Sequence, residues 1–289
     1  MRTALFALVI AFALPATAAA DKPTPGPEHN YADSRTGAAS LPEHTIIAPA
    51  NVEDVPFRLP IVVWGNGGCR DTNEEYHYFL THFAAYGYFI VANGPPGNRY
   101  DPSELTGLLN PQPQKQIAAM DWAVKQNADP TSPYFNRLDT SRIVATGQSC
   151  GGWETTDASA DPRVKTSMVW NSGANAYHPQ GVLDLHAPVL YVDGGKTDYV
   201  AWESNLTYQA TSVPTVLAEH ADAGHTGLWD DPTDGPPPGP YQNEPLVIAQ
   251  QWLAFQLYGS PAGKAFFLGD SCGLCTRPSW TVQSKNWPS

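Results

Sequence analysis

The sequence predicts an α/β fold, in which a mainly parallel central sheet is covered by helices on both faces. Short runs of strand length alternate along the chain with segments that carry apolar residues at helical spacing. The strand-like runs are apolar almost throughout, which is typical of strands buried on both faces. Strand and helix signals in alternation favour parallel pairing through helical crossovers.

The individual elements follow from apolar runs and from the glycines and prolines that end them. The predicted strands are rich in valine, isoleucine and aromatic residues and cover 59–64, 88–93, 142–146, 164–171, 188–192 and 214–218. The predicted helices place apolar side chains three and four residues apart and cover 76–86, 114–126 and 246–257. A small-residue stretch after 149 is suited to starting a further helix.

Length and composition narrow the class of protein. The chain has 289 residues, of which 42% are apolar and 15% charged, so it can bury a large core and is too apolar to be disordered. It carries 28 acidic and 16 basic residues, a net charge of −12. This balance argues against nucleic acid and anionic membrane surfaces as partners, because both attract cations. The oligomeric state does not follow from these numbers.

The first twenty residues predict an export signal. Arg2 precedes an uncharged apolar run over 4–14, Pro15 interrupts it, and small residues before Asp21 provide a cleavage site near Ala20. The run is too short to span a bilayer, and no other segment is apolar enough to do so. We therefore expect a secreted or periplasmic protein with an extended lead-in over 21–40, one α/β domain over 41–260 and a tail over 261–289 with two cysteines.

A nucleophile motif stands out at 147–151. The residues Gly147-Gln148-Ser149-Cys150-Gly151 fit G-x-S-x-G, directly after a predicted strand and before a predicted helix start. In this motif the serine occupies a strained turn that projects its hydroxyl above the sheet, and the glycines allow the backbone to approach closely. Ser149 is therefore the candidate nucleophile, with an incidental serine in a glycine-rich turn as the alternative.

A serine nucleophile needs a base and an acid, which follow it in the order acid, then histidine, in folds with this motif. His225 lies in a flexible turn after the last predicted strand and is the preferred base, with His220 as the alternative. Asp198 stands on the loop after 188–192 and is the preferred acid, with Asp193 as the alternative. The acid would orient the ring and stabilise the imidazolium.

Backbone amides are the expected donors to a developing oxyanion. One should belong to Cys150, the residue after the nucleophile, and the other to the glycine-rich loop that follows the strand at 59–64. Asn66 is the preferred donor in that loop and Gly67 the alternative. A plain glycine turn without such a role is the competing interpretation.

With these motifs, residues 59–258 resemble the α/β-hydrolase superfamily, and within it the dienelactone-hydrolase-like, chlorophyllase-like and polyester-hydrolase (cutinase-like) branch. The resemblance rests on the segments 64–68, 85–91 and 138–143 and on the surroundings of Asp198 and His225. It implies the α/β-hydrolase fold, a Ser149–Asp198–His225 triad and oxyanion amides from Asn66 and Cys150.

Two positions depart from the polyester hydrolases of that branch. They usually carry Met after the serine, where this chain has Cys150, and an aromatic clamp at a position that here falls near Gly173, with Trp170 and Tyr177 close by. The resemblance therefore implies ester hydrolysis more strongly than polymer hydrolysis.

The four cysteines predict two bridges. Cys69 follows the oxyanion loop and Cys150 follows the nucleophile, so a fold that brings these loops together favours a Cys69–Cys150 disulfide. Two free buried thiols are the alternative. Cys272 and Cys275 are close enough in sequence to form a local Cys272–Cys275 disulfide.

The sequence thus predicts a secreted serine hydrolase that cleaves small-molecule or polymeric esters through an acyl-enzyme intermediate, with no cofactor and no metal. Acidic residues within 230–234 suit a surface loop better than a calcium site. The alternatives are a polyester or cutin hydrolase and, from another class, a non-catalytic secreted binding protein. The aromatic residues expected to bind substrate, unless they belong to the core, are Trp153, Trp170, Tyr177 and Tyr199, with Trp202 and Trp229 nearby.

Overall fold

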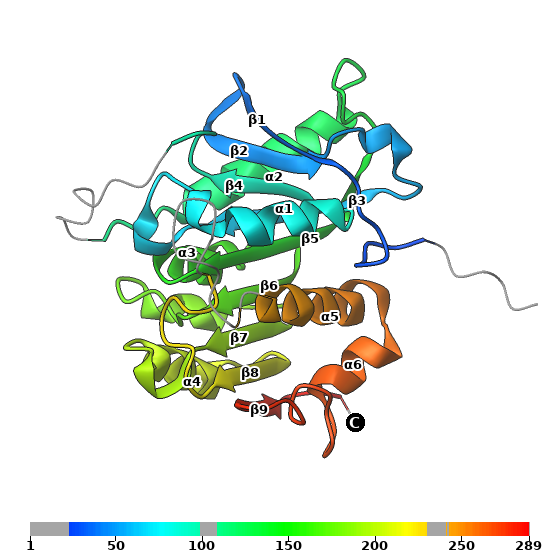
Figure 1. Ribbon diagram of the computed structural model, residues 1–289. Helices are drawn as coiled ribbons and strands as arrows, with labels where there is room; N and C mark the ends of the chain where they lie inside the picture. The colour runs from blue at the N-terminus through cyan, green and yellow to red at the C-terminus, as the bar shows by residue number, and fades with distance from the viewer. Residues whose placement is uncertain (1–22, 99–108, 230–240, 242, 289) are drawn as a thin grey trace, which may run out of the picture.

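The computed structural model describes residues 23–98, 109–229, 241 and 243–288. In this part of the chain nine strands form one sheet in the order β1-β2-β4-β3-β5-β6-β7-β8-β9, with helices on both sides (Figure 1). The prediction of a mixed α/β fold with a mostly parallel sheet is confirmed. The predicted export signal and the acidic loop over 230–240 lie outside the described residues.

The elements have the following bounds. The strands are β1 (Asp33–Ala38), β2 (Leu41–Pro49), β3 (Leu59–Gly65), β4 (Phe89–Asn93), β5 (Leu138–Gln148), β6 (Val164–Trp170), β7 (Val189–Asp193), β8 (Thr215–His220) and β9 (Trp280–Lys285). The helices are α1 (His77–Ala85), α2 (Pro113–Ala128), α3 (Cys150–Ala158), α4 (Ala201–Ala210), α5 (Glu244–Tyr258) and α6 (Pro261–Phe267).

Six central strands run parallel, and antiparallel strands flank them on both sides. β4, β3, β5, β6, β7 and β8 pair in parallel register, whereas β2 pairs antiparallel with β4, β1 with β2, and β9 with β8. The parallel strands are the apolar ones, because helices cover them on both faces.

The sheet extends beyond the predicted domain boundaries of 41 and 260. The segment predicted as an extended lead-in contains β1, and the segment predicted as a tail contains α6 and β9. Each outer strand has one neighbour and, apart from the buried Trp280 of β9, only exposed and partly buried positions, so neither carries the apolar run that marks a buried strand. Part of each predicted end segment therefore belongs to the sheet.

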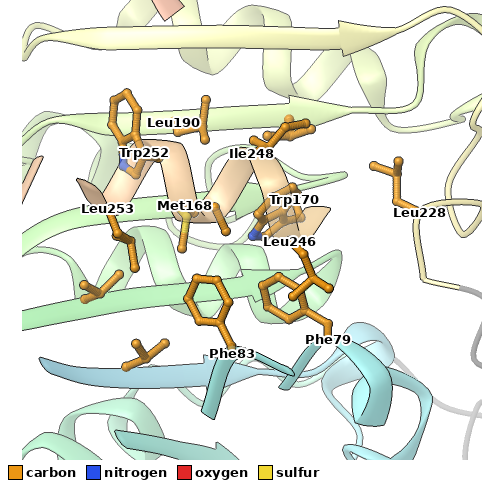
Figure 2. Packing of buried hydrophobic residues seen from close by; sticks show 14 of the residues in the cluster. Phe79, Phe83, Met168, Trp170, Leu190, Leu228, Leu246, Ile248, Trp252 and Leu253 are labelled. Atoms are coloured by element: carbon orange, nitrogen blue, oxygen red, sulfur yellow. The ribbon is translucent and has the colours of Figure 1, made fainter. Parts of the chain in front are cut away.

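Alternate residues of the central strands serve two apolar layers. In β3, Val62 and Trp64 pack in the layer with α1 and α5, whereas Ile61 and Val63 pack in the layer with α2. Figure 2 shows the first layer, where Phe79 and Phe83 of α1 lie opposite Leu246 of α5. Period-two alternation on a strand with two apolar faces produces the near-continuous apolar runs of the sequence.

The carboxyl ends of the parallel strands meet at one edge of the sheet. Gly65 at the end of β3 pairs with Gly147 of β5, Gln148 pairs with Trp170 of β6, and Asp193 ends β7. Loops that follow such strands are the usual place for a site in an open parallel sheet. Among the described residues, no helix has both the length and the apolar character needed to cross a bilayer.

Candidate active site

Ser149 occupies a strained turn between β5 and α3. Its backbone dihedral angles are φ 53° and ψ −120°, a conformation that residues with a side chain rarely adopt. Its N–H donates to Trp170 O over 2.9 Å, and its carbonyl accepts from Gly152 N over 2.8 Å. The turn is therefore fixed from the neighbouring strand and from the helix that follows.

The glycines on either side of this turn are required by close backbone contact. A Cβ atom at Gly147 would lie 2.4 Å from Gly151 O, and one at Gly151 would lie 2.1 Å from Gly65 O. These separations are far inside van der Waals contact, so any side chain at either position would push α3 away from β3 and β5. The spacing of the motif thus has a steric cause in this fold.

Three side chains from three loops form a continuous hydrogen-bonded relay. His225 Nε2 lies 2.9 Å from Ser149 Oγ, and His225 Nδ1 lies 2.8 Å from Asp198 Oδ1. Because an ionised carboxylate only accepts, the Nδ1 atom carries the hydrogen and Nε2 is left to accept from the serine. The side chain of Asp198 is 0% exposed and that of His225 is 9% exposed, so little water competes for these bonds.

Asp198 is held in its ionised form by several donors. Asn171 Nδ2 donates to Oδ2 over 2.8 Å, Gly194 N donates to the same oxygen over 3.2 Å, and Val200 N donates to Oδ1. Burial would raise the pKa of Asp198, but the hydrogen bonds from His225 and Asn171 outweigh it, and the pKa is lowered.

The loops that carry the acid and the histidine pack backbone against backbone. Gly224 N donates to Gly194 O over 2.9 Å, and a Cβ at Gly194 would lie 1.8 Å from Gly224 O. Asn171, at the end of β6, also donates to Gly224 O, so it joins both loops. Sequence reasoning missed Asn171, although its place at the carboxyl end of a predicted parallel strand was the available signal.

The alternative acid and base have other partners. Asp193 Oδ1 accepts from Gly195 N in its own turn, and burial raises the pKa of this carboxyl to about 7. His220 packs against the rings of Tyr241 and Trp280, and its Nδ1 accepts from Asp222 N. The structure thus brings Asp198 and His225, the preferred pair, to Ser149.

The loop after β3 lies against the start of α3, and a disulfide joins the two. Cys69 and Cys150 are bonded, with Cα atoms 5.1 Å apart. Asn66 Nδ2 donates to Asn93 O and Arg70 O, and its Oδ1 accepts from Trp64 Nε1, which fixes the loop from three sides. The second disulfide joins Cys272 to Cys275.

The two candidate oxyanion donors of this loop differ in what they bind. Gly67 N donates to the hydroxyl of Tyr76 over 2.9 Å and is already committed. Asn66 is therefore the better candidate within the loop. Cys150 is the first residue of α3, where backbone N–H groups have no acceptor inside the helix.

The predicted substrate-binding aromatic residues divide into those near the surface and those buried in the core. Tyr199 is 72% exposed with its ring centroid 4.3 Å from that of His225, and Tyr177 is 61% exposed and meets Trp153 edge to face. Trp153 Nε1 donates to Glu203 Oε2 over 2.8 Å, and Glu203 is a further residue that sequence reasoning missed. Of these side chains, Tyr199 contacts the relay directly, through the ring of His225.

The assignment of Trp170 to substrate binding is wrong. Its side chain is 0% exposed, packs against Phe79 and Trp229, and donates from Nε1 to Thr146 Oγ1. It is an inward-facing residue of β6 and belongs to the core. Trp229 is also buried, and its Nε1 donates to Asn171 Oδ1. Trp202, by contrast, is 60% exposed on α4.

Position 173, near which the resemblance places the aromatic clamp of polyester hydrolases, has no room for a side chain. A Cβ at Gly173 would lie 2.5 Å from both Glu203 O and Thr207 Oγ1 of α4. An aromatic residue there would displace α4. In the described part of the chain, no three His, Cys, Asp or Glu side chains gather as a metal site would require.

Comparison with known proteins adds no family assignment. No protein-family model matches the chain, and no curated protein matches it.

Proposed function

We propose that the chain is an exported serine hydrolase of the α/β-hydrolase fold that cleaves carboxylic esters. The observation that carries the proposal is the unbroken relay from Ser149 Oγ through His225 to Asp198 at the carboxyl edge of the sheet. A nucleophile, a base and an orienting acid in mutual hydrogen-bond reach is the arrangement that activates a serine for acyl transfer.

The first step is attack on the ester carbonyl. Ser149 Oγ bonds to the carbonyl carbon while His225 Nε2 takes the hydroxyl proton, and Asp198 stabilises the imidazolium that forms. The negative charge moves to the carbonyl oxygen, where the backbone N–H groups of Asn66 and Cys150 would donate to it. The Cys69–Cys150 disulfide and the bonds of the Asn66 side chain support this arrangement because they fix both donors.

The second step releases the alcohol and then the acid. The bond between the carbonyl carbon and the alcohol oxygen breaks, the leaving oxygen takes the proton from His225, and an acyl group remains on Ser149. Water then attacks this acyl-enzyme, gives its proton to His225, and the carboxylic acid leaves as the proton returns to Ser149. The net reaction consumes one ester and one water and needs no cofactor.

Export fits the cysteine chemistry. All four cysteines are paired, and disulfides persist in oxidising compartments such as the periplasm or the extracellular space. One of the two bridges lies at the candidate site, so an oxidising location would suit the activity as well as the fold.

A polyester or cutin hydrolase is the second candidate, and one surface favours it. Five large apolar side chains are exposed on α4, just before α4, and on the segment that follows β6. They are Tyr177, Leu183, Tyr199, Trp202 and Leu206. The ring centroid of one of them, Tyr199, lies 4.3 Å from that of His225, and exposed apolar side chains beside a site are typical of surfaces that bind apolar ligands. Release of soluble product from polymer film, measured beside turnover of short esters, separates the two candidates.

The proposed function is tested by turnover of p-nitrophenyl esters. Ser149→Ala should abolish turnover and leave the fold intact, whereas Ser141→Ala, at the opposite end of β5, should retain it. Activity of the Ser149→Ala variant above a trace would contradict the proposal. A wild-type protein that neither turns over esters nor reacts with a fluorophosphonate would instead be a non-catalytic binding protein.

A further inference from the structure

We propose that Glu154 is a positioning residue for the oxyanion loop, which it reaches through Asn93, and that gain of a proton by Glu154 changes how this loop is held. The inference rests on the proposed ester hydrolysis and adds to it a residue outside the Ser149–His225–Asp198 relay.

Glu154 joins three elements with one carboxyl group. It lies on α3, five residues after Ser149, and is 2% exposed. Its Oε2 accepts from Asn93 Nδ2 at the end of β4 over 3.1 Å, and its Oε1 accepts from Gln112 N at the start of α2 over 2.8 Å. A buried carboxyl group with these bonds couples the helix behind the nucleophile to two neighbouring elements.

Asn93 connects this carboxyl group to the oxyanion loop. Its backbone carbonyl accepts from Asn66 Nδ2 over 2.8 Å and from Asn73 Nδ2 over 2.9 Å. Glu154 Oε2 also lies beside Gly65, the residue of β3 that leads into the loop, because a Cβ atom at Gly65 would be only 2.8 Å from it. Glu154 therefore bears on both the side chain and the backbone that place the Asn66 amide.

The surrounding network holds two acceptors that the present arrangement leaves unused. Asn93 Oδ1 and Gln116 Oε1 are buried without a hydrogen-bond partner among the described residues. The Gln116 amide adjoins the carboxyl group, since the same Cβ position on Gly65 would lie 2.7 Å from Gln116 Nε2. A buried polar atom without a partner is costly, which makes these acceptors destinations for a new donor.

Protonation of Glu154 would supply that donor. The ionised carboxylate can only accept, as it does now from Asn93 Nδ2, whereas the neutral acid carries an O–H group. Rotation of the Asn93 amide would then offer its Oδ1 to the new O–H. The side chain of Asn93 would exchange its hydrogen bonds with Glu154. The hydrogen bond that the backbone carbonyl of Asn93 accepts from Asn66 Nδ2 would change with it.

The groups around Glu154 place its protonation within the pH range of the test. Burial raises the pKa of Glu154 to about 7, while the hydrogen bond from Gln112 and the charge of Lys115 oppose the rise. Asp71, which pairs with Lys115 Nζ, adds to it. His44 of β2 hydrogen-bonds the Lys115 carbonyl, and burial lowers the pKa of His44, so it adds no charge at neutral pH.

The test is the pH dependence of ester turnover between about pH 5 and about pH 9 in the wild type and in Glu154→Gln. In the wild type, the fall of kcat on the acid side should include one proton taken up by Glu154. Glu154→Gln is neutral at every pH, so its kcat should be about tenfold lower at about pH 8, with KM within about twofold and an acid limb less steep than that of the wild type.

Two further variants keep the test decisive. Glu154→Asp retains a titrating group and should restore the steepness of the wild-type acid limb, and Asp139→Asn, which removes a carboxylate at the far end of β5, should leave the wild-type profile unchanged. A Glu154→Gln profile with the wild-type steepness and kcat would overturn the inference, as would a loss of folding shared by both Glu154 variants. Absence of turnover in the wild type would instead contradict the proposed function.

Discussion

The hydroxyl of Tyr76 accepts a hydrogen bond from Gly67 N and donates one to Gln148 Oε1, each over 2.9 Å. Gln148 Nε2 donates in turn to His225 O over 3.0 Å. One buried phenol and one amide therefore link the oxyanion loop, the turn of the nucleophile and the loop of the histidine. Gln148 occupies a variable position of G-x-S-x-G, and here it has a specific structural task.

Tyr76→Phe should reduce both stability and turnover. It leaves the buried Gly67 N–H and Gln148 Oε1 without their partner, which costs about 1–3 kcal/mol in the free energy of unfolding. Urea unfolding and kcat for a p-nitrophenyl ester measure the two effects. Tyr31→Phe, on the segment before β1, is the control and should change neither; wild-type values in Tyr76→Phe would contradict the linking role.

The two disulfides should differ strongly in their contribution to stability. The bridge between Cys69 and Cys150 spans 81 positions, so replacing both with alanine should lower the free energy of unfolding by about 4 kcal/mol. The bridge between Cys272 and Cys275 spans 3 positions and should contribute far less when both are replaced. Chemical denaturation measures both; only the first double variant should also lose kcat. Equal effects would contradict this account.

Exposed and buried aromatic residues should respond differently to truncation. Tyr199→Ala removes a side chain that is 72% exposed beside His225, so the free energy of unfolding should change by about 0.5 kcal/mol or less, while KM for aryl esters rises. Trp170→Ala opens a cavity in the core and should cost about 3–5 kcal/mol. Thermal unfolding and steady-state kinetics distinguish them, and an unchanged KM in Tyr199→Ala would remove that residue from the substrate surface.

Asp193 should make stability depend on pH. Burial raises its pKa to about 7 in the folded protein, above the value in the unfolded chain. The folded state therefore holds the proton more tightly, and this stabilisation is complete below the unfolded pKa and is lost as pH rises through the folded one. Asp193→Asn lacks this dependence, so its stability relative to the wild type should improve from about pH 5 to about pH 8 in urea unfolding. If the difference in stability between Asp193→Asn and the wild type were the same at every pH, the pKa of Asp193 would not be raised.

The parallel centre of the sheet could be predicted because its strands are apolar on both faces and end at glycine or proline. The outer strands could not: β1 has the sequence Asp-Ser-Arg-Thr-Gly-Ala and buries little on its single paired side. α4 was missed for a related reason. Two large apolar residues, Trp202 and Leu206, face outward, while the small or polar Ser204 and Thr207 face inward, so the usual amphipathic pattern is reversed.

At the site, Ser149, Asp198 and His225 could be placed from motif and order because each follows a predicted strand. The supporting residues could not, since Tyr76, Asn171 and Glu154 act through contacts between segments far apart in the sequence. Trp170 shows the opposite failure. Its closeness in sequence to the site concealed that period-two alternation on β6 turns it into the core.

The most direct test of the central claim is mass spectrometry of the protein after reaction with a fluorophosphonate. The relay predicts one adduct, on the peptide that contains Ser149, formed rapidly by the wild type and far more slowly by His225→Gln and Asp198→Asn. An adduct on another residue, or equal labelling rates in the wild type and His225→Gln, would contradict the relay and the esterase proposal with it.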